Sequence, residues 1–331
     1  MTGVLFTCAG QRVDIVTAFK RAGAIAVAAD LNRLAPALHY ADHAVIPPPV
    51  GDAQYLPSLV ETVVEHEIEL VVPLTDLDMT ILAERRDELG ALLLLPAEDV
   101  VERTNDKYLT HLFLEEHGVG SPAAWLPDEL PDELPFPVLV KPRRGFGSRN
   151  IFTARDHTEL EFFLARTPVE SFVEAFHGGQ EFSIDVFCDL DGRCLNSIPR
   201  TMIESKGGES IKGMTIRDEE LVALGRDVAE TVGVNGPATI QCFRTSPGRH
   251  EVTDVNLRFG GGFPLPLAAG GAYPALALAL ARGERPAPRV GAFREGVVMT
   301  RFFSEVCLTS GEDGTLVSLP EEIGEPVASD D

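Results

Sequence analysis

The stretch TDVNLRFGGG, residues 253–262, combines polar side chains with a run of glycine. Successive side chains of an extended strand point to opposite faces. Alternation therefore places Asp254, Asn256 and Arg258 on one face and the apolar residues between them on the other. A carboxylate, an amide and a guanidinium in line are not expected in a hydrophobic core. The stretch therefore predicts a strand with one functional face.

A preceding expected strand, PATIQCF (237–243), carries Gln241. Carboxylate and amide oxygens are hard donors, so Asp254, Asn256 and Gln241 together would suit Mg²⁺. Arg258 can hold a phosphate or a carboxylate in a two-point grip. The alternation alone brings Asp254 and Asn256 to one face, and it does not place Gln241 beside them.

The stretch VLVKPRRGFGSRNIF, residues 138–152, is an apolar run that ends at Lys141 and continues into cations and glycines. The whole chain has a formal net charge of -23, so this concentration of positive charge is unusual. Local cations and free backbone N–H groups can hold phosphate in an otherwise acidic protein. By itself the loop is a weak signal, because a solvated turn has a similar composition.

The first hundred residues alternate buried apolar runs with amphipathic segments. The expected strands are 3–10, 24–30 and 68–76, and the expected helices are 11–23, 56–67 and 78–90. This alternation predicts an α/β domain with a parallel sheet. The turn CAGQR lacks GxGxxG, so dinucleotide binding is not predicted. Arg12, Thr75 and Asp76 fall at strand tips, where such sheets bind ligands, and they are substrate candidates.

The remainder of the chain has α+β patterning. We expect a helix over 104–118 capped by Thr104 or Asn105, and an exposed connection over 121–137. A hairpin is expected to turn at Asp191 and Gly192, which we prefer to a calcium loop because no closing glutamate follows. Further expected elements are a helix over 218–233, one helix within 264–283 and a final strand over 296–306.

Composition limits the classes of partner. A sequence pI near 4.7 argues against nucleic acid and against an anionic membrane surface. No apolar run approaches the roughly 20 residues of a membrane span. The five cysteines include no CxxC pair, which favours free thiols in a reducing compartment. We therefore expect a cytoplasmic protein that acts on small molecules, and a homodimer is compatible with the sequence.

The order of these motifs resembles the ATP-grasp superfamily, most closely its carbamoyl-phosphate-synthase-like and amino-acid-ligase branch. The resemblance covers about residues 1–290 and includes NDK (105–107) and VEAFHGGQEFSIDV (173–186). It implies an α/β domain over 1–100 and an ATP-grasp domain over 101–290. A mobile lid subdomain is implied at about 120–175, and a C-terminal strand and acidic tail follow over 291–331.

The resemblance also implies site residues. Lys107 and Lys141 are similar to the nucleotide-binding cations, and Lys212 is a further candidate for phosphate. The other implied nucleotide contacts are Gly145, Phe146, Gly147 and Ser148 of the phosphate loop, Phe172, Val173 and Glu174 at the adenine hinge, and Glu181 at the ribose. Magnesium is implied at Gln241, Asp254 and Asn256, with Mn²⁺ as an alternative. Arg258 and Gly260, Gly261 and Gly262 would face the transferred phosphate and the acceptor, and Asp254, Asn256 and Arg258 are the implied catalytic residues.

Two positions depart from the family pattern. The family usually carries glutamate where Asp254 stands, and often proline where Leu257 stands. Aspartate is one methylene shorter, which leaves open whether the site holds one metal ion or two.

The resemblance implies an ATP-dependent carboxylate–amine ligase that forms an acyl phosphate from an amino acid or small peptide and releases ADP and phosphate. One alternative is a kinase or carboxylating enzyme that acts on a small acid or carbamate. Another is a nucleotide-binding regulatory protein with weak turnover, as the Asp254 replacement would permit. The sequence does not identify the carboxylate, the nucleophile or the pathway.

Overall fold

The computed structural model describes residues 1–331 except 146–149, 177, 207–208, 247, 312–314 and 320–331. The chain begins with a parallel sheet in the order β3-β2-β1-β4-β5. Its strands are β1 (Thr2–Thr7), β2 (Ala24–Ala29), β3 (His43–Val45), β4 (Ile68–Pro73) and β5 (Leu92–Leu93). The helices between them are α1 (Val13–Arg21), α2 (Pro36–Tyr40), α3 (Tyr55–Glu65) and α4 (Met79–Glu84), followed by the 3-10 turn η1 (Arg86–Glu88). The predicted α/β class of this region is confirmed.

Helices α5 (Glu98–Asn105) and α6 (Lys107–Glu116) connect this sheet to the remainder of the chain. The expectation that Thr104 or Asn105 caps a helix was wrong. Both residues lie in α5, and Asp106 caps α6 by accepting hydrogen bonds from the backbone N–H groups of Tyr108 and Leu109. Aspartate is as good an N-cap residue as asparagine or threonine, so the local sequence does not single out one of the three. The position of the break between α5 and α6 decides that Asp106 is the N-cap.

The largest sheet is antiparallel, and we call it the floor sheet. Its strand order is β14-β13-β10-β11-β12-β15. The strands are β10 (Gln180–Cys188), β11 (Cys194–Lys206), β12 (Glu209–Thr215), β13 (Gly236–Ser246), β14 (Arg249–Asn256) and β15 (Val298–Thr300). The predicted hairpin turn between β10 and β11 is confirmed, with Gly192 at φ +80°. Helix α8 (Glu219–Val232) begins after Asp218, ends at the left-handed Gly233, and packs on one face of this sheet.

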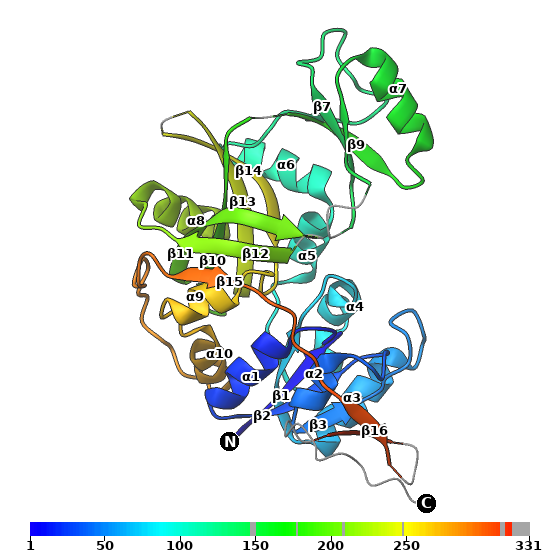
Figure 1. Ribbon diagram of the computed structural model, residues 1–331, viewed down its shortest axis with the longest axis vertical. Helices are drawn as coiled ribbons and strands as arrows, with labels where there is room; N and C mark the ends of the chain where they lie inside the picture. Colours follow the sequence, from blue (N-terminus) through cyan, green and yellow to red (C-terminus); the bar gives the residue numbers. More distant parts are fainter. Residues whose placement is uncertain (146–149, 177, 207–208, 247, 312–314, 320–331) are drawn as a thin grey trace, which may run out of the picture.

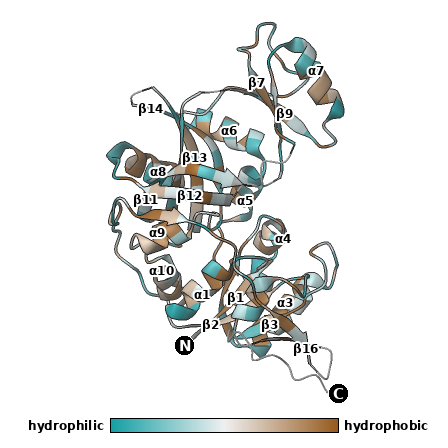
Figure 2. Cartoon of the chain, viewed as in Figure 1, coloured by the Kyte–Doolittle hydropathy of each residue, from teal (hydrophilic) through white to brown (hydrophobic). Residues whose placement is uncertain are grey.

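A smaller antiparallel sheet, the lid sheet, has the order β6-β9-β7-β8. Its strands are β6 (Ala124–Trp125), β7 (Val138–Pro142), β8 (Phe152–Ala154) and β9 (Ser171–Ala175), and α7 (His157–Arg166) packs on it. Figure 1 shows this unit at the far end of the molecule from the N-terminal sheet. In Figure 2 helix α7 carries both hydrophilic and hydrophobic residues, as expected for a helix that covers a sheet on one side.

The C-terminal region differs from the expectations. The single helix expected within 264–283 is two helices, α9 (Pro264–Ala268) and α10 (Tyr273–Ala281). The break contains Gly270 at φ +101°, a conformation that ends a helix. The strand expected over 296–306 is confined to β15, and an unpredicted hairpin of β16 (Leu308–Ser310) and β17 (Leu316–Ser318) follows. Figure 1 draws β16 at the end of the molecule that carries the N-terminal domain.

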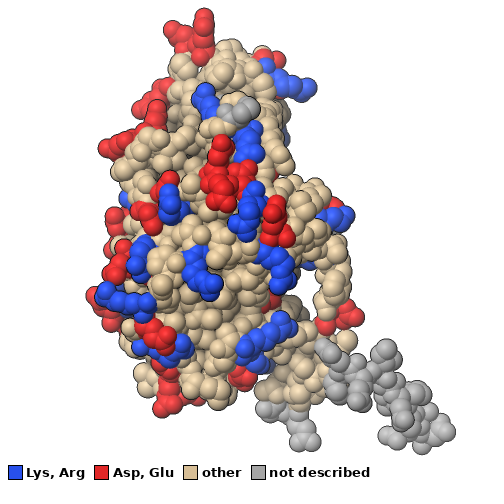
Figure 3. Space-filling model, turned by 90° about the vertical axis from the view of Figure 1, so that its left-hand side faces the viewer, with Lys and Arg blue, Asp and Glu red and all other residues tan. Residues whose placement is uncertain are grey.

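On the face shown in Figure 3, basic and acidic side chains are interspersed. Among the described residues, no helix combines the length and apolar character needed to cross a membrane.

Candidate active site

A cavity of about 270 Å³ lies between the floor sheet and the lid sheet. Charged side chains of both signs line it: Lys107, Lys141, Arg200, Arg258, Glu174, Glu181 and Asp254. Apolar lining comes from Leu139 and Ile151 on the lid side and from Met202 and Phe243 on the floor. A close set of cations beside carboxylates suits a polyanion that carries a metal ion.

The end of β14 and the residues just beyond it present their polar side chains to this cavity. Asp254, Asn256 and Arg258 line it, whereas Val255, Leu257 and Phe259 are buried in the core, as the alternation predicts. The floor sheet also settles the position of Gln241, which is the direct partner of Asp254 across the β13–β14 pairing. The residues suggested as magnesium ligands thus lie together.

Lys107 and Asp254, which both line the cavity, form an ion pair. The Nζ atom of Lys107 lies 2.7 Å from Oδ2 of Asp254, although the residues belong to α6 and β14. Burial alone would raise the pKa of Asp254, but Lys107, Lys141 and Arg258 hold that pKa below its ordinary value. Asp254 is therefore ionised at neutral pH, as a metal ligand must be.

The donor set fits magnesium that is shared with a ligand. Among the residues the structure describes, no three His, Cys, Asp or Glu side chains lie close enough to hold a metal ion by themselves. Mg²⁺ is usually held by one or two carboxylates and completes its shell with phosphate oxygens and water. Asp254, with the amide oxygens of Asn256 and Gln241, fits this mode of binding.

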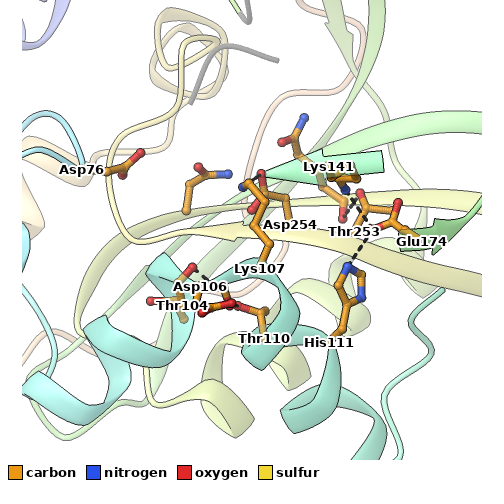
Figure 4. Close-up of polar contacts among 12 residues, drawn as sticks. Asp76, Thr104, Asp106, Lys107, Thr110, His111, Lys141, Glu174, Thr253 and Asp254 are labelled. Carbon is orange, nitrogen blue, oxygen red and sulfur yellow. Dashed lines mark hydrogen bonds and ion pairs between the residues drawn. The ribbon is translucent and has the colours of Figure 1, made fainter. Parts of the chain in front are cut away.

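Lys141, on the lid side of the cavity, belongs to a buried polar cluster with Glu174 and His111. Its Nζ atom lies 2.8 Å from Oε2 of Glu174, and Nε2 of His111 lies 2.7 Å from the same oxygen. Figure 4 shows these groups converging from β7, β9 and α6. Burial would raise the pKa of Glu174, but Lys141 and His111 outweigh it and lower that pKa. His111 was not predicted from the sequence, because nothing in its local pattern distinguishes it from other helix residues.

The residues suggested for the adenine hinge separate into two groups. Glu174 lines the cavity, whereas Phe172 and Val173 are fully buried at 0% exposure and do not line it. The side chains of Phe172 and Val173 are therefore packing residues in this structure. Glu181, suggested for the ribose, does line the cavity, and its Oε1 accepts a hydrogen bond from Nε2 of Gln241 at 3.2 Å.

The basic loop is partly neutralised by protein carboxylates. Arg143 donates to Asp106 and lies 2.6 Å from Glu170, so it holds α6 and the segment before β9 together. Gly145 lines the cavity at φ +139°. The suggested phosphate-loop residues Phe146, Gly147 and Ser148 lie outside the described residues.

Lys212 lies outside the cavity lining. It is exposed on β12, and its Nζ atom is 2.6 Å from Oε2 of Glu204. The expected contact between Lys212 and phosphate stays a prediction that this geometry does not support.

The tips of the N-terminal strands reach the glycine run that follows β14. Arg12 donates to the carbonyl oxygens of Phe259 and Gly260 at 2.8 and 3.0 Å. Asp76 lies 3.1 Å from Nε of Arg258 and points toward the site in Figure 4. Thr75 instead accepts a hydrogen bond from the backbone of Leu77 within its own turn. Arg12 and Asp76 thus position the segment that carries Arg258.

The glycine run packs against a buried polar group. A Cβ atom on Gly262 would lie 2.4 Å from Cζ of Arg200, and one on Gly260 would lie 2.3 Å from Oγ1 of Thr239. Both positions therefore require glycine for close approach. The sequence analysis did not identify Arg200 as a site residue. It also left out Ser183 and Asp185 of β10, although the alternation rule used for β14 would place their side chains on one face of that strand.

Two family models match the chain. Residues 4–93 match the model described as "PylC-like, N-terminal domain". Residues 169–302 match "ATP-grasp in the biosynthetic pathway with Ter operon". The chain contains an ATP-grasp domain. The floor sheet, with Asp254, Gln241 and the glycine run, falls within the ATP-grasp match.

Known proteins resemble the chain over most of its length. The large chain of carbamoyl phosphate synthase from Thermus thermophilus is 26% identical over 202 residues, which is 54% of this chain but only 20% of that protein. The structure of L-amino acid ligase from Bacillus licheniformis has a TM-score of 0.69 at 19% identity, covering 85% of this chain and 74% of the ligase. For N5-carboxyaminoimidazole ribonucleotide synthetase from Thermotoga maritima the TM-score is 0.66 at 19% identity, with 87% and 77% covered.

A third similar structure is the biotin carboxylase domain of 2-oxoglutarate carboxylase from Hydrogenobacter thermophilus, in complex with MgADP, ADP and bicarbonate. Its TM-score is 0.73 at 18% identity, covering 89% of this chain and 73% of that one. Similarity at these identities establishes the predicted ATP-grasp fold, and it leaves the substrate open.

Proposed function

We propose that this protein is an ATP-dependent carboxylate–amine ligase that acts on an amino acid or small peptide. The observation that carries the proposal is the arrangement of Lys107, Arg258 and Asp254 with the amides of Asn256 and Gln241 in one cavity. Cations at this position can hold a triphosphate, and Arg258 can neutralise charge on the phosphoryl group in transfer. The names of the similar ligase and synthetase structures support the same class of reaction.

The reaction has two steps. A carboxylate oxygen of the substrate attacks the γ-phosphorus of ATP, forming an acyl–O–P bond as the bond to the leaving oxygen of ADP breaks. The amine nitrogen then attacks the acyl carbon, phosphate leaves, and the amine loses a proton. Both steps depend on positioning and charge stabilisation, so no protein nucleophile is required.

The protein's own residues provide the positioning. Lys141 and Lys107 would bind the phosphate chain, and Glu181 the ribose. Asp254, Asn256 and Gln241 would hold Mg²⁺, which when bound supplies charge neutralisation on the phosphates. Enclosure between the two sheets would exclude water, which would otherwise hydrolyse an acyl phosphate.

The test is a screen for ADP and phosphate release with ATP, Mg²⁺ and the proteinogenic amino acids, singly and in pairs. A ligase releases ADP with a carboxylic acid and completes turnover only when an amine is present. Hydroxylamine should trap the acyl phosphate as a hydroxamate.

The other classes give different results in the same screen. ADP release with a single acceptor and no hydroxamate indicates a kinase or carboxylating enzyme instead. ATP binding without turnover for any acid indicates the regulatory alternative.

A further inference from the structure

The hydroxyl group of Ser183 is buried in the floor of the cavity. Ser183 is 1% exposed, and its Oγ atom has no hydrogen-bond partner among the described residues. Its neighbours Phe182 and Ile184 pack into the core, so the alternation of β10 directs Ser183 to the opposite face, where it lines the cavity. A buried hydroxyl without a partner carries a free-energy penalty, which a bound ligand can remove.

Ser183 belongs to a row that crosses the floor sheet. It is the direct partner of Gln241 on one side and of Arg200 on the other, and Gln241 is the partner of Asp254. Neighbouring strands lie about 4.8 Å apart. Counted from Gln241, the nearest magnesium candidate, Ser183 is on the next strand and Arg200 is on the strand after that. A group bound over Ser183 would therefore lie next to a phosphate bound over Gln241.

Arg200 is held rigidly at the end of this row. It is 2% exposed, its Nε atom donates to Oδ2 of Asp185 at 2.7 Å, and its Nη1 atom lies 3.4 Å from Oγ of Ser210. Asp185 is in turn fixed by Thr239, whose Oγ1 donates to it at 2.8 Å. A guanidinium group has five N–H donors, so further donors remain for a ligand in the cavity.

We propose that Ser183, Arg200 and Ser210 form the subsite that binds the carboxylate of the acid substrate beside the γ-phosphate. The proposal rests on the proposed function, which requires a carboxylate within attacking distance of that phosphate. Hydroxyl and guanidinium donors match carboxylate oxygens, and a reacting oxygen must come within about 3–3.5 Å of phosphorus. Ser183 lies one strand from Gln241, which would make a carboxylate bound over Ser183 the immediate neighbour of a phosphate bound over Gln241.

The decisive variant is Ser183→Ala, and the matched control is Ser197→Ala. Ser197 is also a buried serine of the floor sheet whose Oγ has no partner among the described residues. Its side chain faces helix α8 and not the cavity: a Cβ atom built on Gly225 of α8 would lie 2.4 Å from the hydroxyl oxygen of Ser197. Each variant deletes a hydroxyl that lacks a partner, so both are expected to fold. Arg200 is unsuitable as the first test, since its removal leaves the buried carboxylate of Asp185 without its cation.

With the acid that gives ADP release in the amino-acid screen, Ser183→Ala should raise KM for that acid roughly tenfold or more, because a hydrogen bond to a charged group is lost. KM for ATP should stay unchanged in Ser183→Ala. In Ser197→Ala, KM for the acid and KM for ATP should both stay unchanged. Ser210→Ala should also raise KM for the acid, as Ser183→Ala does. An unchanged KM for the acid in Ser183→Ala, or a rise in KM for ATP instead, would overturn the subsite and leave the ligase proposal standing.

If no amino acid gives ADP release with the wild-type protein, the ligase proposal fails and the subsite is decided by binding. L-Alanine and acetate are then titrated calorimetrically into the protein loaded with MgADP. Binding that Ser183→Ala abolishes and Ser197→Ala retains supports a carboxylate subsite. The absence of binding to the wild-type protein rejects it.

Discussion

The two sheets that enclose the cavity differ in how they are stabilised. The floor sheet has six strands, among them the thirteen-residue β11, and its core is continuous with α8 and with the N-terminal region. The lid sheet has four strands, and its own cluster of buried hydrophobic residues is Val138, Val140, Ala154, Leu160 and Val173. Regions with few buried apolar contacts open at lower free energy than the main core. We therefore expect the floor to hold the reacting groups rigidly and the lid sheet to supply the part that adjusts to the nucleotide.

The largest expected effect comes from the floor. Asn256→Ala should reduce turnover by at least about 100-fold, because it removes a candidate metal ligand and a contact to Arg258. The free energy of unfolding should change little, because Asn256 is only partly buried and lines a cavity. Steady-state kinetics and denaturant titration check the two halves of this prediction. The companion variant Asp254→Glu restores the usual family residue and should keep or gain activity if Asp254 is merely a short ligand.

A smaller effect is expected from the lid residue Lys141. Lys141→Ala should weaken ATP binding by roughly 10–100-fold, because a charged contact to phosphate is worth about 1.5–3 kcal/mol. The variant also leaves Glu174 buried without its lysine partner, so the lid sheet should lose stability. Calorimetric titration with ATP measures the first effect. The double variant with Glu174→Gln separates the two, since it restores local stability without restoring the contact to phosphate. Equal ATP affinity in wild type and Lys141→Ala would contradict the assignment.

The third prediction uses the two glutamates of the cavity, whose pKa values move in opposite directions. The pKa of Glu174 on the lid sheet is lowered, since Lys141 and His111 outweigh the effect of burial. The pKa of Glu181 on the floor sheet is raised by burial. A lowered pKa in the folded state adds stability at pH values above the ordinary glutamate pKa of 4.5, and this stability is lost as the pH falls through the folded value. A raised pKa adds stability below 4.5 that is lost as the pH rises through the folded value.

Denaturant titrations of Glu174→Gln and Glu181→Gln across this pH range test the contrast. The stability of the wild type relative to Glu174→Gln should decline as the pH falls below 4.5. Relative to Glu181→Gln, it should decline as the pH rises above 4.5. If the stability of the wild type relative to each variant changes with pH in the same way, the predicted electrostatic difference between Glu174 and Glu181 is wrong.

The smallest effect is expected at Lys212, which lies on β12 of the floor sheet and does not line the cavity. Its ion pair with Glu204 is exposed, and such pairs contribute about 0–1 kcal/mol. Lys212→Ala should therefore change neither ATP affinity nor stability by more than about 0.5 kcal/mol. Calorimetry that shows a tenfold loss of ATP affinity would instead support the role implied by the family resemblance.

Much of the fold follows from patterns that are local in the sequence. The alternation in residues 253–259 placed Asp254, Asn256 and Arg258 on the cavity side because side-chain direction in a strand depends only on position. The Gly192 turn was equally predictable from a few neighbouring residues, and the parallel N-terminal sheet was predictable from the alternation of strands and helices over the first hundred residues. The cap at Asp106 was not, because Thr104, Asn105 and Asp106 have similar capping propensities. The break between α9 and α10 was missed although Gly270 and Gly271 are a local signal for it.

By itself, the sequence determined which residue types are available at the site and which way the strand residues face. Only the tertiary structure decided which of them meet. Arg258 contacts Asp76 across 182 positions of the chain, and Arg12 reaches the carbonyl oxygen of Phe259 across 247. The row from Asp254 through Ser183 to Arg200 likewise depends on the register of four strands. Register is set by the burial of whole sheet faces and by turn geometry, so it is a property of the packed sheet and not of any one strand.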